Sequence, residues 1–277
     1  MKHPPYHLRP NKAVDRYLFI ELIRLIGARY PLKDYTYYSM GGPFLEDLRL
    51  IRSAFPEISL VSIERDRDTW NRQKFHMFAR DIELVQKDFT NWVEEDYDPA
   101  GPDIHWLDYV GLEPQCFSDF QEVVRKVEEK SLIKVTFNGR CPKHVDLEDE
   151  EIIDNFKDIF GQFVPADLEA DKLKQKESFA GVLEEMLVLA ADEVREESNG
   201  FGSFHPIHSI RYEDGAPMVC ICGIVVTDDE FELIQDCFED WEFFSAENVA
   251  PHKIDVPELS LKERQRREPL LPLEDPS

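Results

Sequence analysis

Apolar residues along this chain follow two spacings, which predict the strands and the helices. Short, nearly continuous apolar runs predict buried strands, and apolar residues at every third or fourth position predict amphipathic helices. Strands are predicted over residues 35–40, 59–64, 82–87, 103–110 and 131–139, and helices over 11–31, 43–55, 68–80 and 114–130. Strands that alternate with such helices favour an α/β fold with an open, doubly wound, mostly parallel sheet.

The pattern changes after Gly139. An acidic segment over residues 146–171 is predicted to hold one helix, and residues 176–198 predict a longer amphipathic helix. Two apolar runs then follow, over residues 204–214 and 216–226. Because a short turn joins them, we expect an antiparallel hairpin.

The last part of the chain predicts one more helix and a tail. The helix is expected over residues 228–241, with Asp228 or Asp229 as its cap. The aromatic run near Trp241 indicates either a protein contact or a cover for the sheet edge. Residues 256–277 are charged and spaced by prolines, a composition that is typical of disorder.

Composition and charge limit the class of protein. The 277 residues are 42% hydrophobic, which suits one large domain. We expect no membrane span and no secretory signal, and the five unevenly spaced cysteines indicate reduced thiols in a cytoplasmic protein.

The charge is unevenly distributed along the sequence. Residues 1–80 hold 14 basic and 9 acidic side chains, whereas the whole chain has a net charge of −25. This asymmetry permits a basic N-terminal face that meets an anion, while the acidic remainder would repel free duplex nucleic acid. Two differently solvated surfaces would explain the same numbers.

Polar residues and glycines gather where the predicted strands end. Gly41 and Gly42 follow the first strand, Glu64 ends the second, and Asp88 and Asp108 end the third and fourth. Ligands of open parallel sheets bind beyond these ends, and an acid after the second strand is well placed to accept the hydroxyls of a ribose. The pattern therefore predicts a cleft for an adenosine-bearing ligand.

Each of these residues also has a purely structural interpretation. The two glycines would suit a plain strand-to-helix turn, with Pro43 in the first turn of the helix. Glu64 could pair with a nearby arginine, Asp88 could cap a helix, and Asp108 could accept hydrogen bonds at the sheet edge. Arg9, Asn11 and Lys12 either fold over the cleft toward an anion or begin a helix as solvated polar residues.

The segments YYSMGGPFLEDLRLI, VSIERD and IHWLDYVG resemble those of class I S-adenosylmethionine-dependent methyltransferases. The resemblance spans roughly residues 11–226 and implies a Rossmann-like seven-stranded sheet that ends in the antiparallel hairpin. More narrowly, these segments and HLRPNKAVDR are similar to a bacterial group labelled O-methyltransferases, some of which accompany antiphage defence loci.

The resemblance implies a cofactor, S-adenosylmethionine, and its site. The implied contacts are Ser39, Met40, Gly41 and Gly42 for the first cofactor motif, Glu64 for the ribose, and Asp88 and Phe89 for the adenine. Asp108 would face the methyl-transfer pocket as a base or positioning group, beside Tyr109 and Asn138. The resemblance also implies three regions: an N-terminal helical cap over 1–34, a methyltransferase-like domain over 35–245 with an acidic insertion at about 142–198, and a tail over 246–277.

The sequence departs from the family pattern in two places. Tyr38 stands near the position of the usual acid, and only two adjacent glycines remain of the glycine motif. The segment 107–111 has no Asn-Pro-Pro-Tyr or Pro-Cys motif, which disfavours enzymes that methylate nucleic-acid bases.

Two groups of residues have the side chains that metal sites use. Asp108 and Asn138 could hold a divalent cation, but two oxygen ligands are too few to predict one. Two histidines, His205 and His208, lie on the same predicted hairpin as Cys220 and Cys222, but their spacing fits inward packing better than a zinc site. We therefore predict no metal.

Three functions remain open. The first is a cytoplasmic methyltransferase acting on oxygen of a small or macromolecular acceptor. The second is a methyltransferase-like binding subunit without turnover, whose acidic surface or C-terminal tail contacts a protein partner. The third is a module that senses another nucleotide in the same cleft.

Overall fold

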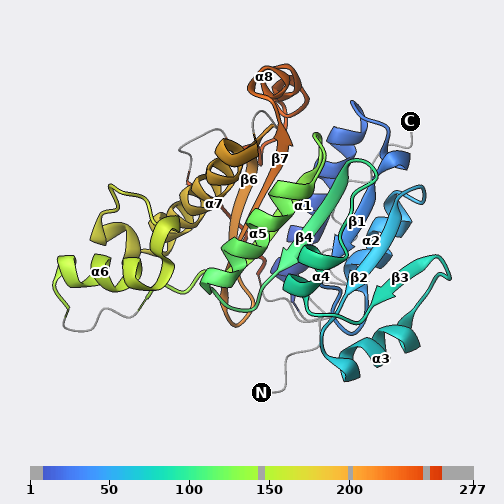
Figure 1. The fold of residues 1–277 in the computed structure, drawn as a ribbon, viewed down its shortest axis with the longest axis horizontal. Coiled ribbons are helices and arrows are strands. Elements are labelled where there is room, and N and C mark those ends of the chain that lie inside the picture. The colour runs from blue at the N-terminus through green and yellow to red at the C-terminus, as the bar shows by residue number, and fades with distance from the viewer. Residues whose placement is uncertain (1–8, 143–146, 199–201, 246–249, 258–277) are drawn as a thin grey trace.

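A computed structural model describes residues 9–142, 147–198, 202–245 and 250–257 (Figure 1). The core is one sheet with the strand order β3-β2-β1-β4-β5-β7-β6-β8. The strands are β1 (Thr36–Ser39), β2 (Ser59–Ile63), β3 (Ile82–Val85), β4 (Asp103–Asp108), β5 (Leu132–Asn138), β6 (Ser203–Glu213), β7 (Pro217–Val226) and β8 (His252–Lys253).

The predicted fold is confirmed, with one strand more than the seven expected. Strands β1 to β5 pair in parallel, and β7 runs antiparallel to both β5 and β6. The additional strand, β8, pairs in parallel with β6 through Ile210 and Arg211 and lies within the predicted tail. Chain order reverses between β1 and β4, so the crevice at their carboxyl ends is the topological switch point.

Helices cover both faces of the sheet (Figure 1). One face carries α4 (Phe89–Glu95), α5 (Pro114–Lys126), α6 (Asp149–Phe160) and α7 (Lys176–Ser198). The other carries α1 (Pro10–Gly27), α2 (Glu46–Ala54) and α8 (Asp228–Ile234). In Figure 1, α6 projects at the left, and α3 (Arg67–His76) lies beside β3 at the opposite end.

Strand β5 shows how the sequence builds the two layers. Side chains of a strand alternate between its faces. Ile133, Val135 and Phe137 enter the core beneath α5 and α7, whereas Leu132 enters the core beneath α1. Lys134 shares the face of Leu132 and is also buried, where it pairs with the buried Asp15 of α1.

The first helix, α1, is anchored by contacts from distant parts of the chain. Among the described residues, the N-cap residue Arg9 makes no side-chain hydrogen bond that caps it. Instead, Asp214, in the turn between β6 and β7, accepts hydrogen bonds from the backbone N–H groups of Asn11 and Lys12. N–H groups in the first turn of a helix have no intrahelical partner, so Asp214 serves as a cap that a distant part of the chain supplies.

The long helix over residues 176–198 and the antiparallel hairpin are confirmed. Two helix starts differ from expectation. Helix α2 begins at Glu46 and not at Pro43, because Leu45 before it adopts a left-handed conformation with φ 54°. The cap of α8 is Thr227, whose side chain accepts from the N–H of Glu230, so the predicted cap at Asp228 or Asp229 is wrong.

Other predicted segments were too long or too short. The helix predicted over 68–80 ends at His76, and the short helix α4 was not predicted.

Near Trp241 the aromatic run packs on the sheet: Phe243 O lies 2.9 Å from His208 Nδ1, and the N–H of Ser245 donates to Ile207 O. Within the described residues, this run covers the β6 edge.

Predictions for residues 258–277 lie outside the described ranges, and the three predicted regions stay a prediction. None of the helices in the described part of the chain combines the length and apolar character needed to cross a bilayer.

Candidate functional site

The turn after β1 is a backbone arrangement that requires glycine. Gly41 and Gly42 both have positive φ values, 33° and 44°. A Cβ atom on Gly41 would lie 1.9 Å from Oγ of Ser62, so a side chain is excluded by space as well as by conformation.

Side chains from β1 and α3 hold the turn in place. Gln73 is buried, and its Nε2 donates to the carbonyl of Gly42 at 3.1 Å. The backbone N–H of Gly41 donates to Oγ of Ser39 at 3.2 Å. Together with the left-handed Leu45, these contacts place the first turn of α2 beside the end of β1.

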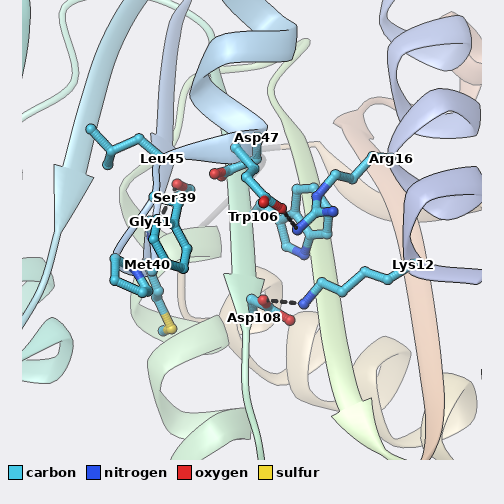
Figure 2. A pocket seen from close by; sticks show the side chains of 13 residues that line it. Lys12, Arg16, Ser39, Met40, Gly41, Leu45, Asp47, Trp106 and Asp108 are labelled. Atoms are coloured by element: carbon cyan, nitrogen blue, oxygen red, sulfur yellow. Dashed lines mark hydrogen bonds and ion pairs between the residues drawn. The ribbon is translucent and has the colours of Figure 1, made fainter. Parts of the chain in front are cut away.

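A narrow cleft lies at the switch point between β1 and β4 (Figure 2). Its lining consists of Lys12, Arg16, residues 39–47, Trp106 and Asp108. Figure 2 shows Lys12 and Arg16 reaching from α1 toward the side of the cleft that Asp108 and Trp106 form. The free space is about 30 Å³, which admits little more than water.

Two ion pairs cross this cleft. Nζ of Lys12 lies 2.5 Å from Oδ2 of Asp108, and Nη2 of Arg16 lies 3.2 Å from Oε2 of Glu46. Burial alone would lower the pKa of Lys12, but the Asp108 carboxylate outweighs it and raises that pKa above its usual value. The lysine is therefore charged. Nε of Arg16 is buried and has no hydrogen-bond partner among the described residues.

Trp106, which lines the cleft, is held by contacts on several sides. The indole of Trp106 donates from Nε1 to Oγ1 of Thr136 at 3.0 Å. Lys134 Nζ lies 3.8 Å from the centre of the Trp106 ring, and Phe19 packs edge-on against it. A side chain held on several sides in this way gives a fixed surface against which a ligand can be positioned.

Of the predicted cofactor contacts, Ser39, Met40, Gly41 and Gly42 line the cleft, but Glu64 does not. Oε1 of Glu64 accepts the backbone N–H of Asp66 at 2.8 Å, and the residue is half-buried. Burial raises the pKa of its carboxyl group. The ribose contact at Glu64 stays a prediction.

The predicted adenine residues are also outside the cleft lining. Asp88 caps α4 by accepting the N–H of Thr90 at 3.2 Å and pairs with Arg65 at 3.9 Å. Phe89 is buried against Trp92, with 5.5 Å between ring centres. The structure thus supports the capping interpretation of Asp88 and assigns the Phe89 ring to the core.

The three predicted catalytic residues are not brought together. Asp108 lines the cleft, but Tyr109 points to the other face of the sheet, where its hydroxyl donates to Oδ2 of Asp119 at 3.0 Å. Asn138 uses Oδ1 to accept the backbone N–H of Arg140. Neither residue lines the cleft, and no contact joins Asn138 to Asp108 among the described residues.

A second, apolar opening lies at the same edge of the sheet. It is formed by the segments that follow β4 and β5 and by α6, and it includes Asn138, Phe156 and Ile159. Ile159 is 58% exposed although it is a large apolar residue. The acidic insertion therefore presents an apolar surface to this groove.

Two polar residues at the start of α1, Asn11 and Lys12, are buried. Lys12 is buried and contacts Asp108, so the interpretation as a solvated helix start is wrong for it. Asn11 is buried too, and its Nδ2 donates to Glu213 O and Asp214 Oδ1.

Sequence reasoning missed Arg16, Glu46 and Trp106. A signal was present, because Lys12 and Arg16 continue the helical face of the buried Phe19, and charges on a buried face need partners.

The histidines and cysteines of the hairpin are packed separately. Nδ1 of His208 contacts the carbonyl oxygen of Phe243, and Nε2 of His205 lies 3.4 Å from Oδ1 of Asp228. Sγ of Cys220 lies 3.2 Å from Oγ1 of Thr136. Among the described residues no group of three or more His, Cys, Asp or Glu side chains could hold a metal ion.

Comparison with known proteins identifies a family. A family model described as "Putative O-methyltransferase" matches residues 4–277 of this chain. None of the curated proteins matches the sequence.

Solved structures with similar coordinates are distant. LepI in complex with SAM shares 11% identity over 73% of this chain, with a TM-score of 0.43, and this chain spans 46% of its length. Human N-acetylserotonin methyltransferase in complex with SAM shares 15% identity over 76% of this chain and 56% of its own, with a TM-score of 0.39. The fibrillarin pre-rRNA processing protein of Methanococcus jannaschii shares 10% identity over 72% of this chain and 70% of its own, with a TM-score of 0.42.

Proposed function

We propose, from the premise that this chain belongs to the family described as "Putative O-methyltransferase", that it is an S-adenosylmethionine-dependent methyltransferase directed at oxygen. The observation that carries the proposal is the family match, which extends over residues 4–277. The strand order and the position of the cleft at the switch point agree with it, because cofactors of such sheets bind there.

The residues of the cleft fit the methionine end of this cofactor. S-adenosylmethionine, when bound, supplies an electrophilic methyl group on a sulfonium and carries an amino-acid group with both charges. The cleft lining offers two cations, Lys12 and Arg16, and three carboxylates, Glu46, Asp47 and Asp108. One buried donor, Nε of Arg16, lacks a partner among the described residues. A ligand with both charges suits this set.

The adenosine end would extend past the glycine turn toward β2. Glu64 is the first carboxylate after β2 and is half-buried, so it is available to accept ribose hydroxyls. Gln73 and Ser39 fix the glycine turn, so the backbone there is already held for a ligand. Such prior fixing lowers the entropy that binding costs.

Asp108 is the residue best suited to the acceptor. Its side chain is 31% exposed at the end of β4, whereas the side chain of Lys12 is 7% exposed. We assign Asp108 the role of accepting the hydroxyl proton of the acceptor, and Lys12 the role of stabilising the resulting oxygen anion. Methyl transfer chiefly requires alignment and this proton removal.

The apolar groove beside α6 is the proposed route for the acceptor. It opens at the carboxyl ends of β4 and β5, and β4 also carries Asp108. Its exposed Ile159 favours an acceptor with an apolar body.

A second candidate function is a binding subunit without turnover. The observation that favours it is the narrow cleft, which two ion pairs span and which holds about 30 Å³ of free space. In either case we propose a cytoplasmic protein, since its five cysteines are all free thiols.

Calorimetric titration separates these functions. S-adenosylmethionine, S-adenosylhomocysteine, ATP and NAD are titrated into the full chain. Binding of the first two in roughly the micromolar range, without ATP or NAD, supports the proposed cofactor. Release of S-adenosylhomocysteine with a panel of hydroxyl acceptors supports turnover, whereas binding without release supports the second candidate. Failure to bind either sulfur compound contradicts both.

A further inference from the structure

We propose that the Arg16–Glu46 ion pair is the receptor for the amino-acid end of the cofactor: Arg16 binds the α-carboxylate and Glu46 binds the α-ammonium. The inference rests on the proposed function, because it concerns how the same cleft holds S-adenosylmethionine. It assigns to α1 and α2 a task that methyltransferases usually give to an acid just before the glycine turn, where this chain has Tyr38.

Arg16 has the features of a carboxylate ligand. Its side chain is 8% exposed and lines the cleft, where Nη2 forms an ion pair with Oε2 of Glu46 at 3.2 Å. Its Nε is buried without a hydrogen-bond partner among the described residues. A buried donor left unpaired costs free energy, so a ligand acceptor at this position is favoured. A guanidinium can bind a carboxylate through two parallel hydrogen bonds, which makes arginine better suited to this task than lysine.

Tyr38 does not replace the missing acid. Its ring stacks on His105, with 4.8 Å between ring centres, and packs against Trp92 and Tyr97 on the other face of the sheet. Because Tyr38 points away from α1, the ammonium group needs a carboxylate from elsewhere.

Glu46 supplies that carboxylate. It lies in the first turn of α2, directly after the glycine turn, and its side chain is 29% exposed in the cleft lining. The neighbouring Asp47 already accepts the hydroxyl of Tyr37 at 2.9 Å. Of the two acids, Glu46 is therefore the one that pairs with a cation in the cleft. The ammonium group of the ligand can take the place of that cation, Arg16.

Binding then exchanges one ion pair for two. In the structure the Arg16 and Glu46 charges neutralise each other. An amino-acid group inserted between them would satisfy both side chains and both of its own charges. The free space of about 30 Å³ is too small for an amino-acid group, so binding requires side chains of the cleft lining to move.

Three ligands test the inference on the full chain. S-adenosylhomocysteine carries both charges, its decarboxylated analogue keeps only the ammonium, and 5′-methylthioadenosine carries neither. On the unaltered protein we expect S-adenosylhomocysteine to bind at least tenfold more tightly than either of the other two. Equal affinity for S-adenosylhomocysteine and 5′-methylthioadenosine would overturn the inference without any variant.

Variants then locate the contacts. Arg16→Gln should weaken S-adenosylhomocysteine at least tenfold, leave 5′-methylthioadenosine within twofold, and abolish the difference between S-adenosylhomocysteine and its decarboxylated analogue. Glu46→Gln should weaken the two amine-bearing ligands and spare 5′-methylthioadenosine. Arg24→Gln is the matched control, since Arg24 is exposed on the same helix outside the cleft lining.

The outcomes are distinct. Equal weakening of all three ligands by Arg16→Gln, or an unchanged preference for the carboxylate in that variant, overturns the inference while the proposed cofactor stands. If the unaltered protein binds none of the three ligands, the proposed function itself is wrong.

Discussion

Lys134 and Asp15 form an ion pair in which Nζ and Oδ1 are 2.6 Å apart, with both side chains shielded from solvent. The pair joins α1 to the centre of the sheet. Cys220 also faces Asp15, and Lys134 lies over the Trp106 ring. The helix that carries Lys12 and Arg16 is thus fixed to the sheet by an ion pair at Asp15, the residue before Arg16 of the cleft lining.

Breaking this pair should destabilise the protein strongly. Asp15→Asn or Lys134→Met each leaves one uncompensated buried charge, which costs about 3–5 kcal/mol of unfolding free energy. The double variant should lose clearly less than the sum of the single losses, because no lone charge remains. Urea unfolding curves measure all three, and additive losses would show that the two charges do not interact.

The tertiary cap of α1 gives a smaller effect. Asp214→Ala removes the acceptor for the N–H groups of Asn11 and Lys12, so we expect a loss of about 1–2 kcal/mol in unfolding free energy. Asp240→Ala is the control, since Asp240 is exposed. Equal stability of the two variants would argue against the cap.

A buried acid should give the stability a pH dependence. Asp103 lies at the start of β4, where Tyr97 donates to its carboxylate at 2.5 Å, and burial raises its pKa from 3.8 to about 7. As pH rises from about 4 to 7, the unfolded chain loses this proton while the folded protein keeps it. Asp103 therefore contributes stability at low pH that is lost as pH rises through this window.

The Asp103→Asn variant isolates this effect. Denaturant unfolding between pH 4.5 and 7.5 should show the stability of the unaltered protein falling relative to the variant, by at most about 1.4 kcal/mol per pH unit. His105 is buried nearby with its pKa lowered to about 3, but it is present in both proteins, so its contribution cancels. A difference independent of pH would mean that Asp103 is ionised in the fold.

Glu64 should act on the other end of the cofactor. If its carboxylate accepts ribose hydroxyls, Glu64→Ala should weaken S-adenosylhomocysteine and 5′-methylthioadenosine equally, by about 1.5–3 kcal/mol. That pattern differs from the one expected for Arg16→Gln. Glu83→Ala, an exposed acid on β3, is the control for charge, and unchanged affinity in Glu64→Ala would remove Glu64 from the site.

Periodicity predicted the sheet and the helix Lys176–Ser198 because their buried faces repeat regularly over many residues. It failed for α2, where the left-handed Leu45 delays the helix, since no apolar spacing reports a backbone conformation. Strand β8 has two residues and exists only through its pairing with β6, so no local signal could predict it.

The site was predictable in part for the same reason. Residues at or just after the ends of strands, such as Asp108 and Gly41, are located by local order, and both line the cleft. Local order does not predict the directions of side chains. Tyr109 donates a hydrogen bond to Asp119, and Lys12 pairs with Asp108, which is 96 positions away in the sequence. Contacts of that range depend on how layers pack, which the pattern of one segment does not contain.

The cap at Asp214 also gives the cleft an order of assembly. During synthesis, the helix bearing Lys12 leaves the ribosome long before the carboxylate that caps its first turn, since Asn11 and Asp214 are 203 positions apart. A nascent chain therefore has the glycine turn and the first strands well before the cap of α1 is available. The cap is complete only when the hairpin of β6 and β7 has emerged, so a chain that stops before Asp214 lacks this contact at the start of the helix that carries Lys12.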